Sequence, residues 1–200
     1  MSRISGHRSL APATGFTLVE IMVATGLSAI VFAAILSAYL FLGRNLTRLV
    51  NTQEQGVASR RALQRFTQDL SAAIQIATTP TPSTSQVAFT KPAKSATATS
   101  DTVTYAYSSG AGTLTRTEVV VDPAATPSTA TATTTLLSHV TAFTLNYYDA
   151  AGNSVTPTSL FVKSVEFTFT SATGSATSGT LASYQMVSPR VLVRNKLALQ

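Results

Sequence analysis

The sequence contains no cysteine and no tryptophan, and few of its residues carry a charge. Without cysteine the chain can form no disulfide, no thiol nucleophile and no cysteine-ligated metal site. Charged residues make up 11% of the 200 residues, against about 25% in an average soluble domain, whereas 44% are hydrophobic. The length allows one ordinary domain with an appendage and excludes a large multidomain enzyme. Part of the apolar content must therefore lie outside a soluble core.

Acidic residues are also scarce, which leaves a formal net charge of +6. From Thr78 to the carboxyl end, seven basic residues face five acidic ones. This small excess does not favour nucleic acid as a partner. Half of the basic residues instead flank one apolar stretch, which favours lipid head groups as the partner. These flanking residues are Arg3, Arg8, Arg44, Arg48, Arg60, Arg61 and Arg65.

The apolar stretch, residues 21–42, runs for 22 residues without a charge. As a helix it is about 33 Å long, enough for a hydrocarbon core of about 30 Å. A secretory signal peptide is the alternative, but its apolar core is about 7 to 15 residues long and ends at a small-residue cleavage site. We therefore expect a retained single-pass anchor. The basic residues on its two sides are too evenly balanced to set its orientation.

The residues before the stretch, MSRISGHRSLAPATGFTLVE, form a basic leader that ends in Gly15, followed by Phe16 and a lone Glu20. This segment resembles the amino terminus of type IV pilins and pseudopilins. The resemblance implies that a prepilin peptidase removes residues 1–15 on the cytoplasmic side and methylates the new amino terminus at Phe16. It further implies a transmembrane helix over residues 16–42, a cytoplasmic amino terminus and a periplasmic or extracellular head.

Glu20 is the one charged residue in the apolar helix, and such residues usually mark function. In the resembling family this carboxylate pairs with the methylated amine of a neighbouring subunit and sets the register of the filament. The alternative is that Glu20 merely complements the helix dipole in the first turns while the head-group region keeps it hydrated. The resemblance favours the first interpretation.

The helical pattern continues over residues 43–77, where Leu63, Phe66 and Leu70 recur at spacings of three and four residues, with Ala73 and Ile74 beyond them. The polar residues of this segment, Asp69 among them, are predicted to lie on the other faces. Pro80 is expected to stop the helix. The segment therefore needs a surface that covers its apolar stripe.

Residues 78–200 change to an alternating pattern of β-branched and aromatic residues, which predicts a β-rich head. Residues 122–135 are polar and are predicted to be a mobile loop. A long helix laid across an antiparallel sheet is the pilin architecture, so the expected fold class is α+β and type IV pilin-like. The predicted strands are residues 86–90, 102–107, 114–121, 140–148, 160–170, 181–187 and 190–193.

Within this family, the segments VTAFTLNYYDAAGN, EFTFT and SPRVLVRNK resemble PilW-like and J-type minor pseudopilins of type II secretion. Arg190 and Arg194 lie in the last segment. The alternative for both is that they are solvated charges on an edge strand, where they discourage unwanted pairing.

Catalytic motifs are sparse. His7 lies in the leader. No serine of the sequence stands in a nucleophile-elbow motif, so His139 has no serine that is marked as a catalytic partner. Asp149 and Asn153 are two oxygen donors on a turn, too few for calcium. We therefore expect no enzyme activity, no cofactor and no metal site.

The sequence predicts a minor pilin or pseudopilin whose partners are prepilin peptidase, other subunits of the filament, the inner-membrane assembly platform and lipid. Two alternatives remain at this stage. One is a subunit that binds DNA for uptake in competence, and the other is a single-pass membrane-anchored binding protein that never assembles. The sequence does not separate a secretion pseudopilus from a type IV pilus.

Overall fold

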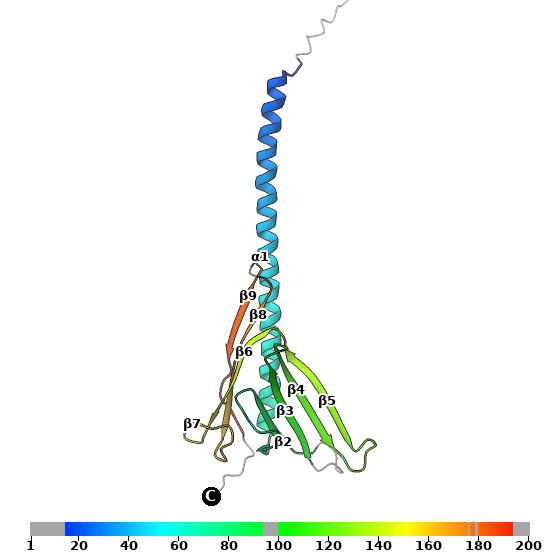
Figure 1. The fold of residues 1–200 in the computed structure, drawn as a ribbon, viewed down its shortest axis with the longest axis vertical. Coiled ribbons are helices and arrows are strands. Elements are labelled where there is room, and N and C mark those ends of the chain that lie inside the picture. The colour runs from blue at the N-terminus through cyan, green and yellow to red at the C-terminus, as the bar shows by residue number, and fades with distance from the viewer. Residues whose placement is uncertain (1–14, 94–99, 176, 179, 194–200) are drawn as a thin grey trace, which may run out of the picture. The chain divides into compact units, whose positions relative to one another are not determined.

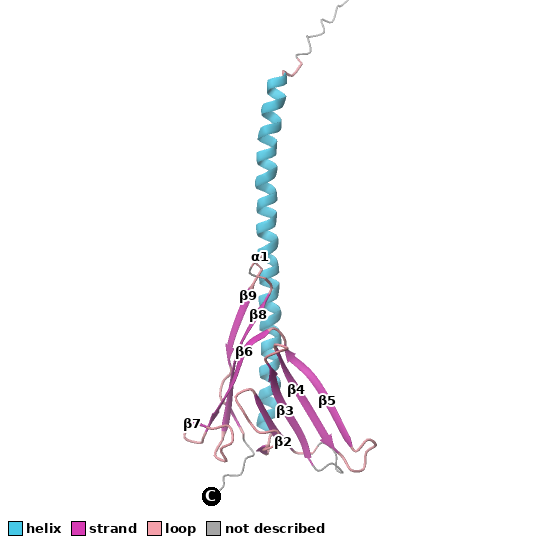
Figure 2. Ribbon diagram, viewed as in Figure 1, coloured by secondary structure: helices cyan, strands magenta, loops and turns pink. Residues whose placement is uncertain are grey.

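The computed structural model describes residues 15–93, 100–175, 177–178 and 180–193. It contains one long helix, α1 (Leu18–Ala72), followed by antiparallel strands (Figure 2). This confirms the α+β prediction, a layout like that of type IV pilins. The chain divides into two compact units, Met1–Gly43 and Arg44–Gln200, and α1 contributes residues to both.

The strands of the second unit form two sheets, which lie on different sides of the carboxyl-terminal half of α1 (Figure 1). The first sheet has the order β1-β2-β3-β4-β5, and the second has the order β10-β8-β6-β7, with β9 also paired to β8. The first sheet comprises β1 (Gln75–Ile76), β2 (Gln86–Lys91), β3 (Ser100–Ser108), β4 (Thr113–Val121) and β5 (Thr129–Leu137). The second comprises β6 (Val140–Tyr148), β7 (Ser154–Val155), β8 (Ser164–Thr173), β9 (Ala182–Val187) and β10 (Val191–Leu192).

The core of this unit lies where α1 meets both sheets. Phe66 is 2% exposed and packs edge-to-face against Tyr105 of β3 and Phe167 of β8, with ring centroids 5.1 and 5.0 Å apart. Leu70 and Ala73 are buried beside it. The predicted apolar stripe on α1 is therefore covered as expected, except at Ile74, which is 41% exposed.

α1 ends at Ala72, five residues before the predicted end. The chain then pairs with β2 through β1, and the backbone N–H groups of Ile74 and Ala77 donate to the carbonyls of Thr90 and Ala88. Strand pairing therefore terminates the helix well before Pro80. The prediction that Pro80 stops the helix was therefore wrong.

The prediction of a mobile loop over residues 122–135 was wrong for its second half, because β5 begins at Thr129 and pairs with β4. β5 is exposed on both faces from Thr129 to Thr135. It therefore lacks the alternation of apolar and polar residues that reveals a half-buried strand, although its threonines favour strand structure.

Other predicted strands changed at their ends. β8 begins at Ser164 and continues to Thr173, whereas the strand was predicted from residue 160 to 170. Within β8 the prediction of two faces is confirmed, since Val165, Phe167 and Phe169 are buried on one of them. The turn at residues 149–153 is also confirmed, with Gly152 at a positive φ of 87°.

Candidate functional site

The predicted cleavage point lies just before α1. Gly15, Phe16 and Thr17 are exposed and not helical, and the Phe16 side chain is 84% exposed. A protease binds its substrate as an accessible, non-helical segment, and these residues meet that condition. Residues 1–14 of the predicted leader lie outside the described residues.

Thr17 and Glu20 cap the first turn of α1. The Thr17 Oγ1 accepts a hydrogen bond from the Glu20 N–H at 3.2 Å, and the Thr17 N–H donates to the Glu20 Oε2 at 3.0 Å. The Thr17 hydroxyl also donates to Oε2, at 3.0 Å. This reciprocal arrangement is a capping box, which satisfies backbone donors that a helix start leaves free. Glu20 therefore has a local capping role beyond the favourable placement of its charge near the helix start.

The Glu20 carboxylate is not used up by this cap. All three hydrogen bonds join Glu20 to Thr17, and Oε2 is the only carboxylate oxygen that takes part in them. Oε1 makes no hydrogen bond with another described residue. A shallow groove starts beside the carboxylate and runs along the helix past the small residues Ala24 and Ser28. The carboxylate can therefore accept a donor that comes from outside the chain.

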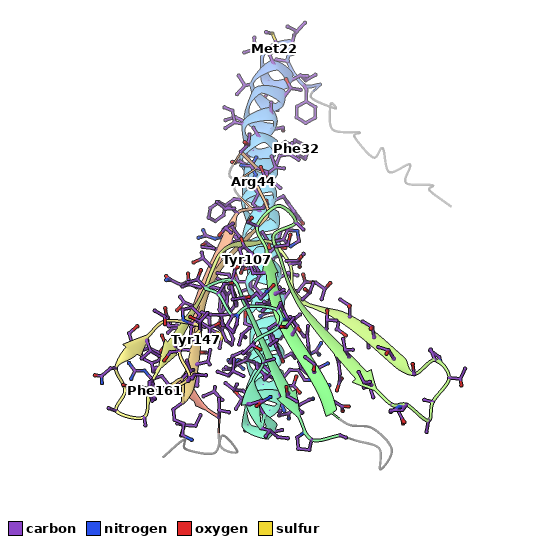
Figure 3. All side chains as sticks on the ribbon, turned by 60° about the horizontal axis from the view of Figure 1, so that its bottom comes forward. Met22, Phe32, Arg44, Tyr107, Tyr147 and Phe161 are labelled. Carbon is purple, nitrogen blue, oxygen red and sulfur yellow. The ribbon has the colours of Figure 1, made fainter. Side chains whose placement is uncertain are left out.

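The apolar half of α1 is left uncovered by the described residues of its own unit. Every side chain from Leu18 to Leu42 is exposed, and Met22 and Phe32 point outward from the helix (Figure 3). By length and composition, this is the one helix among the described residues that could cross a membrane. It is a candidate single membrane span.

The second notable group is a cluster of charges buried between α1 and the first sheet, formed by Asp69, Lys91, Tyr105, Arg116 and Glu118. We call it the buried charge cluster. Arg116 donates to both carboxylate oxygens of Asp69, through Nε at 2.5 Å and Nη2 at 3.2 Å. Lys91 donates to Asp69 at 2.9 Å, and Tyr105 donates its hydroxyl proton to the same carboxylate at 2.9 Å. Glu118 accepts from Lys91 at 3.3 Å and from Arg116 at 3.0 Å.

Electrostatics fix the protonation states in this cluster. Burial alone would raise the pKa of Asp69, but the hydrogen bonds from Arg116 and Lys91 outweigh it and hold that pKa below its usual range. Burial, with the neighbouring Asp69 carboxylate, raises the pKa of the Tyr105 hydroxyl well above its ordinary value. Asp69 is thus ionised and Tyr105 neutral near neutral pH. Both side chains therefore serve to hold the fold together, and neither titrates near neutral pH.

The position of Asp69 overturns the sequence prediction, which placed this residue on a face away from the core. It is buried because three partners from β2, β3 and β4 meet it there. One signal was available in the sequence. Arg116 and Glu118 follow Leu114 at spacings of two residues, which places all three on one face of β4, and this face is buried.

The remaining candidate residues separate from one another. His139 is exposed, at a positive φ of 57°, and makes no hydrogen bond to a serine or aspartate among the described residues. Asn153 donates its N–H to the Asp149 carboxylate at 2.8 Å, so these two residues hold the turn over residues 149–153 together by a local hydrogen bond. In the part of the chain that the structure describes, no three His, Asp or Glu side chains gather as metal ligands.

Arg190 is exposed beside the edge strand β10, as expected of a solvated charge, with 51% of its side-chain surface accessible, but it also contacts two neighbouring strands. Its guanidinium lies 3.8 Å from the centre of the Tyr148 ring, and its Nε lies 3.8 Å from the Glu166 carboxylate. It therefore holds the segment before β10 against β6 and β8. Arg194 lies outside the described residues.

No protein-family model matches this chain, and no curated protein matches it either.

Proposed function

We propose that this chain is a minor pilin or pseudopilin, a structural subunit that prepilin peptidase processes after Gly15 and that enters a type IV pilus-like or type II secretion filament. One observation carries the proposal. An exposed apolar helix with a single carboxylate at its start follows directly after an accessible Gly15–Phe16 bond. The packing of the other half of α1 on antiparallel sheets also supports it.

The physical basis is an exchange of surroundings for the apolar helix. In the bilayer its side chains contact lipid, and in a filament they contact helices of other subunits, so the transfer costs little hydrophobic free energy. Small residues beside Glu20, such as Ala24 and Ser28, let another helix approach closely. The helix can therefore leave the inner membrane for a protein core, with the assembly platform supplying the work.

Glu20 supplies the register in this proposal. A carboxylate moved into an apolar filament core is costly unless it is paired, and the new amine at Phe16 of a neighbouring subunit is the matching charge. The cap from Thr17 does not compete, because it leaves Oε1 without a hydrogen bond to the described residues. Cleavage creates the amine that the carboxylate needs.

The test separates the register role of Glu20 from its capping role. Glu20→Gln keeps the size of the side chain but removes the charge, and we expect normal processing with much less of the variant in sheared filaments. Thr17→Ala removes the capping partner and keeps the carboxylate, so this control should still enter filaments. Equal filament content for Glu20→Gln and the unmodified chain would rule out the register role.

A further inference from the structure

The outward face of α1 in the second unit carries an ordered mixture of apolar and charged side chains. Val50 and Val57 are 51% and 49% exposed, although both are apolar. Glu54 and Arg61 lie next to them and are also exposed. Each pair is seven residues apart, which is two turns, so its members lie on nearly the same face of the helix. We call these four residues the outer stripe.

The two charges of the outer stripe cannot satisfy each other within one helix. Seven residues correspond to about 10.5 Å along the axis, far beyond the reach of an ion pair. Neither Glu54 nor Arg61 makes an ion pair with any described residue. Both line one shallow groove, with Val57 and Ala58 between them. The groove thus has a negative end and a positive end.

This pattern is complementary to itself after a shift. Two parallel copies in equal register would place Glu54 against Glu54 and Arg61 against Arg61, which is repulsive. A displacement of seven residues instead places Glu54 of one copy against Arg61 of the next, and Val50 against Val57. Because seven residues return to the same face within about 20°, the two stripes stay in contact along the helix.

Other displacements that keep the face are less favourable. A shift of four residues places Val57 against Arg61 and forms no ion pair. A shift of eleven residues brings Glu54 to Arg65, but Arg65 already lies 3.9 Å from Asp69. It also sets Val50 against Arg61. The seven-residue shift alone among these three joins both the charges and the valines.

We propose that the outer stripe binds a second copy of this chain, parallel and displaced by seven residues, through Glu54–Arg61 and Val50–Val57 contacts. The proposal rests on the proposed assembly function, because copies anchored by one amino-terminal span in the same membrane must run parallel. It adds a register contact in the head, separate from Glu20.

The absence of cysteine makes the register directly measurable. Full-length Val50→Cys and Val57→Cys copies are co-expressed, and their membranes and filaments are oxidised. We expect the mixed dimer, joined through positions 50 and 57, to dominate over dimers of either variant alone, because a disulfide forms only between close Cα atoms, about 4.4 to 6.8 Å apart. Both charges of the outer stripe remain in place in this experiment.

Each competing arrangement gives a different product and would overturn the proposal. Dimers of each variant with itself indicate equal register, and a dimer of Val50→Cys with Arg61→Cys indicates the eleven-residue shift. An antiparallel pair that sets Glu54 against Arg61 would instead join Val50→Cys to Arg65→Cys. No dimer from any pair means that another protein covers the stripe.

Charge exchange tests the ion pair itself. Glu54→Arg in both cysteine copies should reduce the mixed dimer about fivefold, and adding Arg61→Glu should restore it. Processing at Gly15 and the effect of Glu20→Gln are followed in the same cells. If both remain as expected while the mixed dimer is absent, the register is wrong and the assembly function stands. If both fail, the assembly function itself is wrong.

Discussion

The two halves of the continuous helix α1 differ in how their side chains are covered. Apart from Glu20, residues 18–42 are uncharged and exposed on every side, whereas residues 44–72 bury one face against two sheets. The second half even buries Asp69, and its partners come from three strands of the same chain. The described residues thus cover one face of the second half and leave the first half exposed.

The same contrast holds for two acids of α1, one from each half, which have different surroundings. Asp69 is surrounded by two cations and a tyrosine hydroxyl, which fix α1 on the first sheet. Glu20 has only the local Thr17 cap among the described residues. A carboxylate whose hydrogen bonds are all made within the chain stabilises the fold, whereas one with an oxygen left without a donor is suited to bind a partner.

The contrast is broken most strongly at the buried charge cluster. Asp69→Ala leaves Arg116 and Lys91 buried with fewer counter-charges, and we expect a loss of about 3 to 5 kcal/mol in the free energy of unfolding of the head. The control is Arg65→Ala, which removes an exposed partner of the same carboxylate and should cost less than about 1 kcal/mol. Unfolding of the full chain in detergent, followed by near-ultraviolet circular dichroism of the tyrosines, measures both.

Two phenylalanines of α1 compare the halves directly. Phe66→Ala opens a cavity between the sheets and should cost about 3 to 5 kcal/mol of head stability. Phe32 is 65% exposed, so Phe32→Ala should leave head unfolding unchanged while weakening the interactions of the anchor helix. A head that tolerates Phe66→Ala as well as Phe32→Ala would show that α1 does not form the core.

Two glycines extend the comparison to the backbone. Gly174 follows β8 with φ at +95°, and a Cβ there would meet the Thr180 carbonyl oxygen. Gly174→Ala should therefore cost about 1 to 3 kcal/mol. Gly26, in the exposed half of α1, has open space around it, and Gly26→Ala should leave the head unaffected. Identical melting curves for the two variants would contradict the close approach at Gly174.

The pH dependence of head stability should be bounded by the buried charge cluster. The pKa of Asp69 is lowered on folding, so its contribution is present above its unfolded pKa of about 4 and is lost as the pH falls below that. The pKa of Tyr105 is raised, so its contribution is present below about 10 and is lost at higher pH. Asp69→Asn should flatten the acid limb of a stability profile. Tyr105→Phe should make the alkaline limb less steep, and the rest of that limb belongs to Tyr147, whose pKa is also raised by burial.

The sequence predicted those parts of the fold that depend on local periodicity. The strand over residues 140–148 was predicted with the bounds it has, because apolar and polar residues alternate along it. β5 was missed because both of its faces meet solvent over most of its length. Asp69 was misplaced because its burial depends on partners 22 to 47 residues further along the chain. The capping box could have been predicted, because Thr17 and Glu20 stand three residues apart in the spacing that such boxes use.

The amino terminus of the protein isolated from its own membrane tests the account most directly. Intact mass and amino-terminal peptide mass spectrometry should find a chain that begins at Phe16 and carries a methyl group on its new amine. A chain that begins at Met1 would lack the amine that Glu20 is proposed to pair with. A chain that begins after Leu42 would lack the exposed apolar helix altogether, and either result would contradict the proposed function.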